Sequence, residues 1–162
     1  MKYCIKCLSN DVRPHLEFNS EGVCSACITA MAKDSGINWK QREGTLVKIF
    51  DKFRRTQEGV YDCIVPVSGG KDSIYQVHMV KNVYGMNPLC ITFRTLARTK
   101  RGEENIQALR NMGVDHIDFS PNPIGVNKIT KRAFLEYGDC SLLDHLAIYS
   151  ILPNLAKKLN IP

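Results

Sequence analysis

The order of apolar and polar positions along the chain predicts a small α/β domain that follows a segment with little core of its own. Apolar residues recur at helical spacing between residues 38 and 56, which predicts an amphipathic helix. Short apolar runs then alternate with amphipathic stretches. The expected strands are 62–67, 88–93 and 115–119, and the expected helices are 73–85, 103–112, 126–137 and 142–159, the last bent or interrupted at Pro153. This alternation predicts a parallel sheet with flanking helices.

The same pattern divides the chain into three sections. Residues 1–37 hold two cysteine pairs but few periodic apolar positions, so a bound metal would have to supply stability. Residues 38–58 are expected to form a connecting helix, and residues 59–162 the α/β domain. The chain ends in a helix followed by residues 160–162, where another strand would be expected to begin, so we expect this domain to be incomplete at its carboxyl end.

Four of the seven cysteines form two C-x-x-C pairs with sixteen residues between them, and these are Cys4, Cys7, Cys24 and Cys27. Each pair can bend around one side of a tetrahedral Zn²⁺, and four thiolates leave no open coordination position. We therefore expect a structural zinc site, with an iron–sulfur cluster as the alternative. Cys63 and Cys90 fall within expected strands and are interpreted as core thiols.

A glycine-containing turn follows the first expected strand, with the sequence Ser68-Gly69-Gly70-Lys71-Asp72-Ser73. Adjacent glycines let backbone N–H groups approach an anion, and the helix that follows adds its own free N–H groups. Lys71 can neutralise phosphate charge, and the hydroxyls of Ser68 and Ser73 can donate hydrogen bonds. The alternative is an ordinary turn in which Asp72 or Ser73 caps the helix. The spacing matches neither G-x-x-x-x-G-K-[ST] nor G-x-G-x-x-G.

Composition narrows the class of protein only slightly. The 162 residues carry a net charge of +6 and are 44% hydrophobic, without a long apolar span or a signal segment, so we expect a cytoplasmic protein that does not insert into membranes. The positive charge is compatible with an anionic ligand, but it is spread along the chain and does not by itself indicate RNA binding.

The turn resembles the S-G-G-x-D-S signature of the PP-loop ATP pyrophosphatases, which hold the pyrophosphate of ATP and transfer AMP to a substrate oxygen. This resemblance implies ATP and Mg²⁺ as cofactors and phosphate contacts along Ser68–Ser73. Lys71 and Asp72 would be the catalytic residues, with Asp72 either holding Mg²⁺ or stabilising its own helix. The backbone at Thr92 and Phe93 would lie near the adenosine. Arg94, Arg98 and Lys100, in the loop that follows, could meet phosphate or sugar but are interpreted as exposed positive charge.

Beyond the turn, the chain is similar to the amino-terminal part of the bacterial N-acetyl sugar amidotransferases. The match is carried by Tyr3-Cys4-x-x-Cys7, Arg13-Pro14, Glu21-Gly22-Val23-Cys24-Ser25-Ala26-Cys27, Tyr61-Asp62-Cys63-Ile64-Val65-Pro66-Val67, Tyr75-Gln76-Val77, Gly85-Met86-Asn87-Pro88-Leu89 and Gly113-Val114-Asp115-His116-Ile117. The family converts an acetamido group of a nucleotide-linked sugar to an acetamidino group during surface polysaccharide (O-antigen, lipopolysaccharide) or flagellin-glycan biosynthesis. Glutaminase and cyclase-like partners would supply the ammonia.

Two other functions stay open at this point. Some PP-loop tRNA thiolases also carry cysteine zinc sites, but only Cys90 and Cys140 follow the turn, fifty residues apart, so tRNA is not the expected partner. The chain could also be a noncatalytic, zinc-stabilised nucleotide-binding subunit. The family continues with a further strand and a substrate-binding region, so a fragment of this length could bind ATP weakly and catalyse nothing.

Overall fold

The computed structural model describes residues 1–55, 59–94 and 98–162, and the chain divides into two compact units, Met1–Leu46 and Val47–Pro162. The helix expected over residues 38–56 is α2 (Trp39–Phe53), which contains the boundary between the units. The expected end of this helix at Thr56, and the section boundary at residue 58, lie outside the described residues.

The first unit contains a helix that the apolar pattern did not predict, α1 (Ser25–Gly36). Every residue of α1 keeps part of its surface exposed, and Ile28 and Met31 are 39% and 42% exposed. Because α1 buries no continuous apolar stripe, helical periodicity is weak in its sequence. Ahead of it, the chain makes isolated antiparallel bridges between Tyr3 and Asn10 and between Phe18 and Cys24.

The second unit is built on a parallel sheet of three strands in the order β1-β2-β3. The strands are β1 (Cys63–Pro66), β2 (Pro88–Phe93) and β3 (Asp115–Phe119). Val65 pairs with Cys90, which in turn pairs with His116. The predicted α/β class and parallel sheet are confirmed, and β2 and β3 have the expected bounds.

Helices connect the strands and extend the unit. They are α3 (Lys71–His78), the π-helical turn η1 (Met79–Val83), α4 (Lys100–Asn111), α5 (Pro123–Tyr137) and α6 (Leu142–Lys158). Helix α4 starts at Lys100 rather than at the expected Glu103, because the Thr99 side chain accepts a hydrogen bond from the Gly102 N–H. Helix α6 runs through Pro153 without interruption. In the described ranges, none of the helices combines the length and apolarity needed to span a bilayer.

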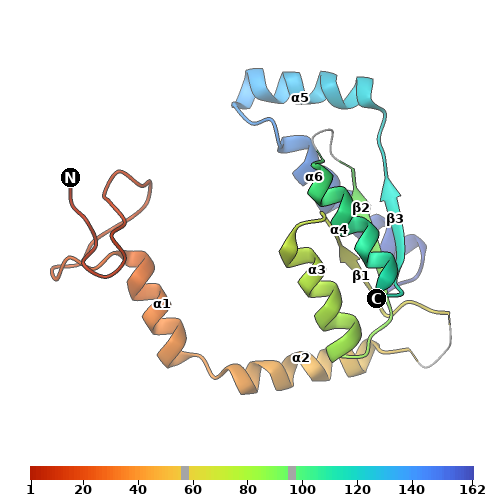
Figure 1. The fold of residues 1–162 in the computed structure, drawn as a ribbon, viewed down its shortest axis with the longest axis horizontal. Helices are drawn as coiled ribbons and strands as arrows, with labels where there is room; N and C mark the ends of the chain where they lie inside the picture. The colour runs from red at the N-terminus through yellow and green to blue at the C-terminus, as the bar shows by residue number, and fades with distance from the viewer. Residues whose placement is uncertain (56–58, 95–97) are drawn as a thin grey trace. The chain divides into compact units, whose positions relative to one another are not determined.

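Helices cover both faces of the sheet, as Figure 1 shows. Alternate residues of β2 point to opposite faces. On one face Cys90 packs in a core with Val77 of α3 and Leu109 of α4. On the other face Leu89 and Ile91 pack with Leu152 and Leu155 of α6, and with Ile161. A central strand buried on both faces explains why residues 88–93 are apolar almost without alternation.

The last turns of α2 belong to the second unit, and hydrogen bonds of the residues just after the helix join it to the rest of that unit. The Arg54 guanidinium donates to the carbonyl of Gly85 at 2.5 Å. Asp62, which is 3% exposed, accepts hydrogen bonds from the backbone N–H groups of Arg55 and Asn87 at 2.6 and 2.7 Å. These bonds satisfy a buried carboxylate just before β1 and fix the start of that strand.

Candidate functional site

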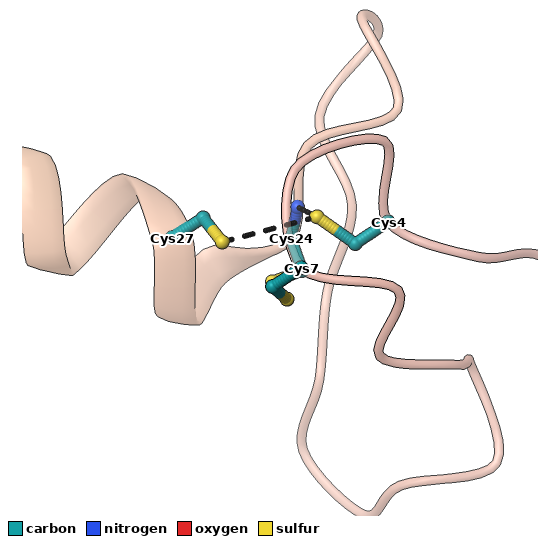
Figure 2. A group of neighbouring side chains, drawn as sticks. All are labelled: Cys4, Cys7, Cys24 and Cys27. Atoms are coloured by element: carbon teal, nitrogen blue, oxygen red, sulfur yellow. Dashed lines mark hydrogen bonds between the residues drawn. The ribbon is translucent and has the colours of Figure 1, made fainter.

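The four predicted cysteines come together in the first unit (Figure 2), and their sulfur atoms all lie within 4.8 Å of one another. The Sγ atoms of Cys4 and Cys27 are 3.9 Å apart, and those of Cys7 and Cys24 are 3.6 Å apart. Four sulfurs at about 2.3 Å from a tetrahedral Zn²⁺ would lie about 3.8 Å from one another. The group could therefore hold a metal ion such as zinc.

Backbone geometry positions these thiols and prepares Cys4 for deprotonation. Cys24 immediately precedes α1, and Cys27 lies in its first turn. The backbone N–H groups of Cys24 and Lys6 donate to Cys4 Sγ at 3.3 and 3.4 Å. These bonds, that of Cys24 above all, lower the pKa of the Cys4 thiol to about 6. Hydrogen bonding with Cys7, together with burial, raises the pKa of Cys27 to about 12.

The apolar core beneath this site is small. Cys4, Val23 and Cys24 are its buried members, and Leu16 and Phe18 pack against them. Two of the three buried residues, Cys4 and Cys24, are thus themselves candidate metal ligands. With a core of this size, most of the stability of the first unit would have to come from a bound metal.

In the second unit, the predicted order of strand, glycine turn and helix is confirmed. The Val67 N–H still pairs with the Ile91 carbonyl at 2.9 Å, so the chain leaves the sheet only at Ser68. Gly69 has φ +82°, a left-handed conformation that side chains disfavour. Gly70 returns to extended dihedral angles and precedes α3. The turn therefore leads directly into the amino end of α3, where the first backbone N–H groups of a helix have no partner within the helix.

Close packing against α4 gives a second reason for glycine at position 69. A Cβ there would lie 2.6 Å from the backbone oxygen of Gly102, a distance that real contacts do not reach. Nearby, the Asn105 amide Nδ2 donates to the Gly69 carbonyl at 2.7 Å. The first turns of α4 thus pack directly against the glycine turn. The sequence pattern carries no signal of this contact.

The polar side chains of the turn differ in their availability. Lys71 and Asp72 pair at 2.6 Å, and their side chains are 87% and 86% exposed, so both are free to meet a ligand. The Ser73 hydroxyl donates to the Gly70 carbonyl at 2.8 Å. Ser68 Oγ accepts a longer bond, 3.3 Å, from the Gly70 N–H. In the present arrangement, Ser68 is therefore the more available of the two hydroxyls.

A cavity of about 340 Å³ opens at the carboxyl ends of the strands, where ligands bind in parallel α/β sheets. Its lining residues are Pro66, Val67, Ser68, Ile91, Thr92, Phe93, Arg98, Phe119, Ala147, Ile148, Ile151 and Leu152. The structure thus brings Ser68, Thr92 and Phe93 to one cavity. Lys71 borders a separate groove of about 550 Å³, shared with Tyr75 and His78 of α3 and with Asn105 of α4.

Arg98 corrects one expectation, because it is not an exposed charge. Its side chain is 8% exposed and lines the cavity. The guanidinium donates to both carboxylate oxygens of Asp118, at 2.8 and 2.9 Å, and to Glu103 at 3.1 Å. Arg94 also donates to Asp118, at 2.6 Å. The pairings with Asp118 join residues 20 and 24 positions apart, so spacing along the sequence could not reveal them.

The charge network gives a prediction about stability. Arg98, and then Arg94, hold the pKa of Asp118 well below its usual range, so the carboxylate stabilises the fold at neutral pH. We expect Asp118→Asn to lower the free energy of unfolding of the second unit by about 1–3 kcal/mol at pH 7. The difference from wild type should shrink as pH falls below about 4, because Asp118 takes up a proton there in the unfolded chain, while the folded chain resists protonation down to a lower pH.

Urea denaturation at pH 7 and at pH 3 measures this difference. Glu136→Gln is the matched control, because its exposed carboxylate pairs with Arg132 on the surface of α5. Its expected cost is about 0.5 kcal/mol or less. A deficit of Asp118→Asn that is equally large at both pH values would contradict the prediction.

Thr92 has a structural task in addition to its place at the cavity. Its hydroxyl lies 2.6 Å from the Val67 carbonyl and 2.8 Å from His116 Nε2. Because a carbonyl only accepts, Thr92 donates to Val67, and His116 Nε2 then donates to Thr92. Burial lowers the pKa of His116, which favours its neutral form. Hydrogen bonds from Thr92 of β2 and His116 of β3 thus hold the Val67 carbonyl in place just before the glycine turn.

The prediction of core thiols in β1 and β2 is confirmed for Cys90, which is fully buried, while Cys63 is half-buried. Burial raises the pKa of each to about 11. Both thiols are therefore protonated at neutral pH and poor nucleophiles.

Comparison with known proteins adds little to this geometry. No protein-family model matches the chain. An uncharacterized protein of Methanocaldococcus jannaschii is 25% identical over 105 residues, which make up 65% of the present chain. The match covers 37% of that protein, so the chain spans little more than a third of the length of this relative. Because the relative is itself uncharacterized, the similarity carries no activity over.

Proposed function

We propose that the second unit binds ATP and transfers AMP to a substrate oxygen with release of pyrophosphate, as the PP-loop ATP pyrophosphatases do. One observation carries this proposal above the others. A glycine turn with φ +82° at Gly69 joins the first strand of a parallel sheet to a helix, beside a cavity that Ser68 helps to line. This arrangement suits an anionic group at the turn and the rest of the ligand in the cavity.

Each part of the turn would then have its own role toward ATP. Backbone N–H groups around Gly70, together with the Ser68 hydroxyl, would bind the pyrophosphate oxygens. Lys71, exposed and on the first turn of α3, would neutralise the charge that develops on the leaving pyrophosphate. Asp72 could hold Mg²⁺, which would supply further charge neutralisation.

The cavity suits the adenosine part of the ligand. Its volume of about 340 Å³ falls in the range of small-molecule sites, and most of its walls are apolar side chains of the strands and α6. Phe93 and Phe119 stack with their ring centroids 5.9 Å apart and offer aromatic surface to a purine. The backbone at Thr92 and Phe93 would meet polar edges of the base or ribose.

The reaction that follows from adenylation is replacement of an oxygen. An amide oxygen leaves poorly, but the same oxygen esterified to AMP leaves readily, so ammonia can displace AMP. On the strength of the sequence resemblance, the substrate would be the acetamido group of a nucleotide-linked sugar, with ammonia from glutaminase and cyclase-like partners. The four-cysteine site would hold zinc in a structural role, since four thiolates complete its coordination.

Other functions for the same turn have less support. A sulfur-transferring enzyme acting on tRNA would need a reactive thiol near the adenylated base. Of the two cysteines that follow the turn, Cys90 is fully buried with a pKa raised to about 11, and Cys140 is exposed but is not among the residues that line the cavity. A noncatalytic nucleotide-binding subunit would retain ATP affinity without forming AMP. AMP formation therefore distinguishes an enzyme from a binding subunit.

The role of Lys71 gives the first test. We expect Lys71→Ala to reduce ATP-dependent AMP formation by about 100-fold or more, because it removes a cation from the departing pyrophosphate. AMP and pyrophosphate release are measured with an acetamido-sugar nucleotide and ammonium present. The Lys71 side chain is 87% exposed, so the fold and the metal content should not change.

Lys128→Ala provides the matched control, because Lys128 is an exposed lysine on α5. It should leave AMP formation at the wild-type rate. AMP formed only with tRNA and a sulfur donor would point to the thiolase. ATP binding without AMP under any of these conditions would indicate a binding subunit, and full activity of Lys71→Ala would reject the assigned role.

A further inference from the structure

The peptide bond between Gly69 and Gly70 is the part of the turn whose orientation matters most for an anion. This unit is planar and trans, so its carbonyl and its N–H point in opposite directions. The Gly69 carbonyl points at α4, where it accepts the hydrogen bond from Asn105 Nδ2 at 2.7 Å. The Gly70 N–H therefore points away from α4.

A peptide between two glycines rotates more readily than any other, because neither neighbour has a Cβ to restrict its dihedral angles. If this peptide turned over, the Gly69 carbonyl oxygen would take the place of the Gly70 N–H. A bound phosphate would then meet a partial negative charge in place of a donor. Anion binding at the turn therefore requires an interaction that stabilises one of the two orientations of the Gly69–Gly70 peptide.

We propose that Asn105 is a positioning residue that fixes the Gly69–Gly70 peptide, so that the Gly70 N–H is presented to a bound di- or triphosphate. The consequence for ligand binding rests on the proposed ATP function. Asn105 is well placed for this task, because the next residue in α4, Ile106, is 4% exposed, and Leu109 is fully buried. The helix that carries the amide is therefore anchored in the core.

The present partner of the Gly70 N–H agrees with this role. It donates to Ser68 Oγ at 3.3 Å, which is long for a hydrogen bond. A phosphate oxygen can replace this contact with a shorter, charge-assisted one. The bond from Asn105 to Gly69 lies on the opposite side of the peptide and can persist when the anion binds.

The first experiment observes the peptide directly, without nucleotide. The Gly70 amide resonance is recorded by ¹H–¹⁵N NMR in wild type and in two variants. Asn105→Leu keeps a side chain of similar volume, and Asn105→Ala introduces a residue of high helix propensity. We expect one sharp Gly70 resonance in wild type and a shifted or exchange-broadened one in both variants. Asn111→Leu, at an exposed asparagine of the same helix, is the control and should leave Gly70 unchanged.

The second experiment measures dissociation constants for ATP and for AMP by calorimetry. Loss of Asn105 should weaken ATP binding by about 10-fold and leave AMP binding within about 2-fold, because AMP lacks the pyrophosphate. A general loosening of the site would weaken both ligands alike. An unchanged Gly70 resonance in both variants, or equal losses for ATP and AMP, would overturn the proposal. If wild type binds no ATP, the proposed function fails, while the Gly70 resonance still decides whether Asn105 fixes the peptide.

Discussion

Cys24→Ser is expected to unfold most of the first unit and to release its metal. Cys24 is fully buried, its sulfur lies 3.6 Å from that of Cys7, and its N–H donates to Cys4. Structural Zn²⁺ sites of this kind contribute about 10–16 kcal/mol of binding free energy that is available only to the folded chain. The small core around Val23 cannot replace such a contribution.

Metal analysis and limited proteolysis measure the two parts of this expectation. Wild type should contain about one zinc per chain, and Cys24→Ser much less. Protease should cut the variant within Met1–Leu46 and spare Val47–Pro162, the larger compact unit. A strong chelator should reproduce this pattern in wild type.

Cys140→Ser is the matched control, since Cys140 is exposed and outside the four-sulfur group. It should keep the metal and the wild-type cleavage pattern. Iron, with visible absorbance, would indicate an iron–sulfur cluster in place of zinc. A Cys24→Ser protein whose first unit stays resistant to protease would show that the metal is dispensable for folding.

The second large effect is expected from Gly69→Ala, which should abolish nucleotide binding. The alanine would have to adopt φ +82°, and its Cβ would lie 2.6 Å from the Gly102 carbonyl oxygen. Backbone strain of this kind costs about 1–3 kcal/mol. Because Gly102 is itself part of a helix, the turn rather than α4 would have to move. We expect ATP affinity to fall by about 100-fold or more, since several backbone N–H groups would lose their alignment.

Gly125→Ala is the control, because this glycine lies in α5 with open space where a Cβ would be placed. It should leave ATP affinity unchanged and raise the free energy of unfolding by about 0.5–1 kcal/mol. Calorimetric titration with ATP and thermal unfolding of both variants provide the measurements. Wild-type affinity in Gly69→Ala would mean that the turn does not hold the phosphates.

Much of the architecture follows from local patterns in the sequence. The apolar run at Pro88–Phe93 predicts a strand with the observed bounds, because a strand buried on both faces must be apolar along its own length. The expected bounds of Asp115–Phe119 are also observed, although this strand has polar residues at three of its five positions and buries none of them fully. The spacing of the cysteines predicts the four-sulfur group, since each C-x-x-C pair forms half of it locally. The paired glycines predict the turn, because the left-handed conformation of Gly69 is a local requirement.

Tertiary structure alone decided which distant side chains support the site. Asn105 meets the carbonyl of Gly69 across 36 positions, and Arg98 meets Asp118 across 20. Helix α1 also escaped prediction, since it buries no apolar stripe. Periodicity records how a residue relates to its own helix or strand. Hydrogen bonds and ion pairs between elements depend on how the elements pack, and a single polar residue carries no sign of its partner until the chain has folded.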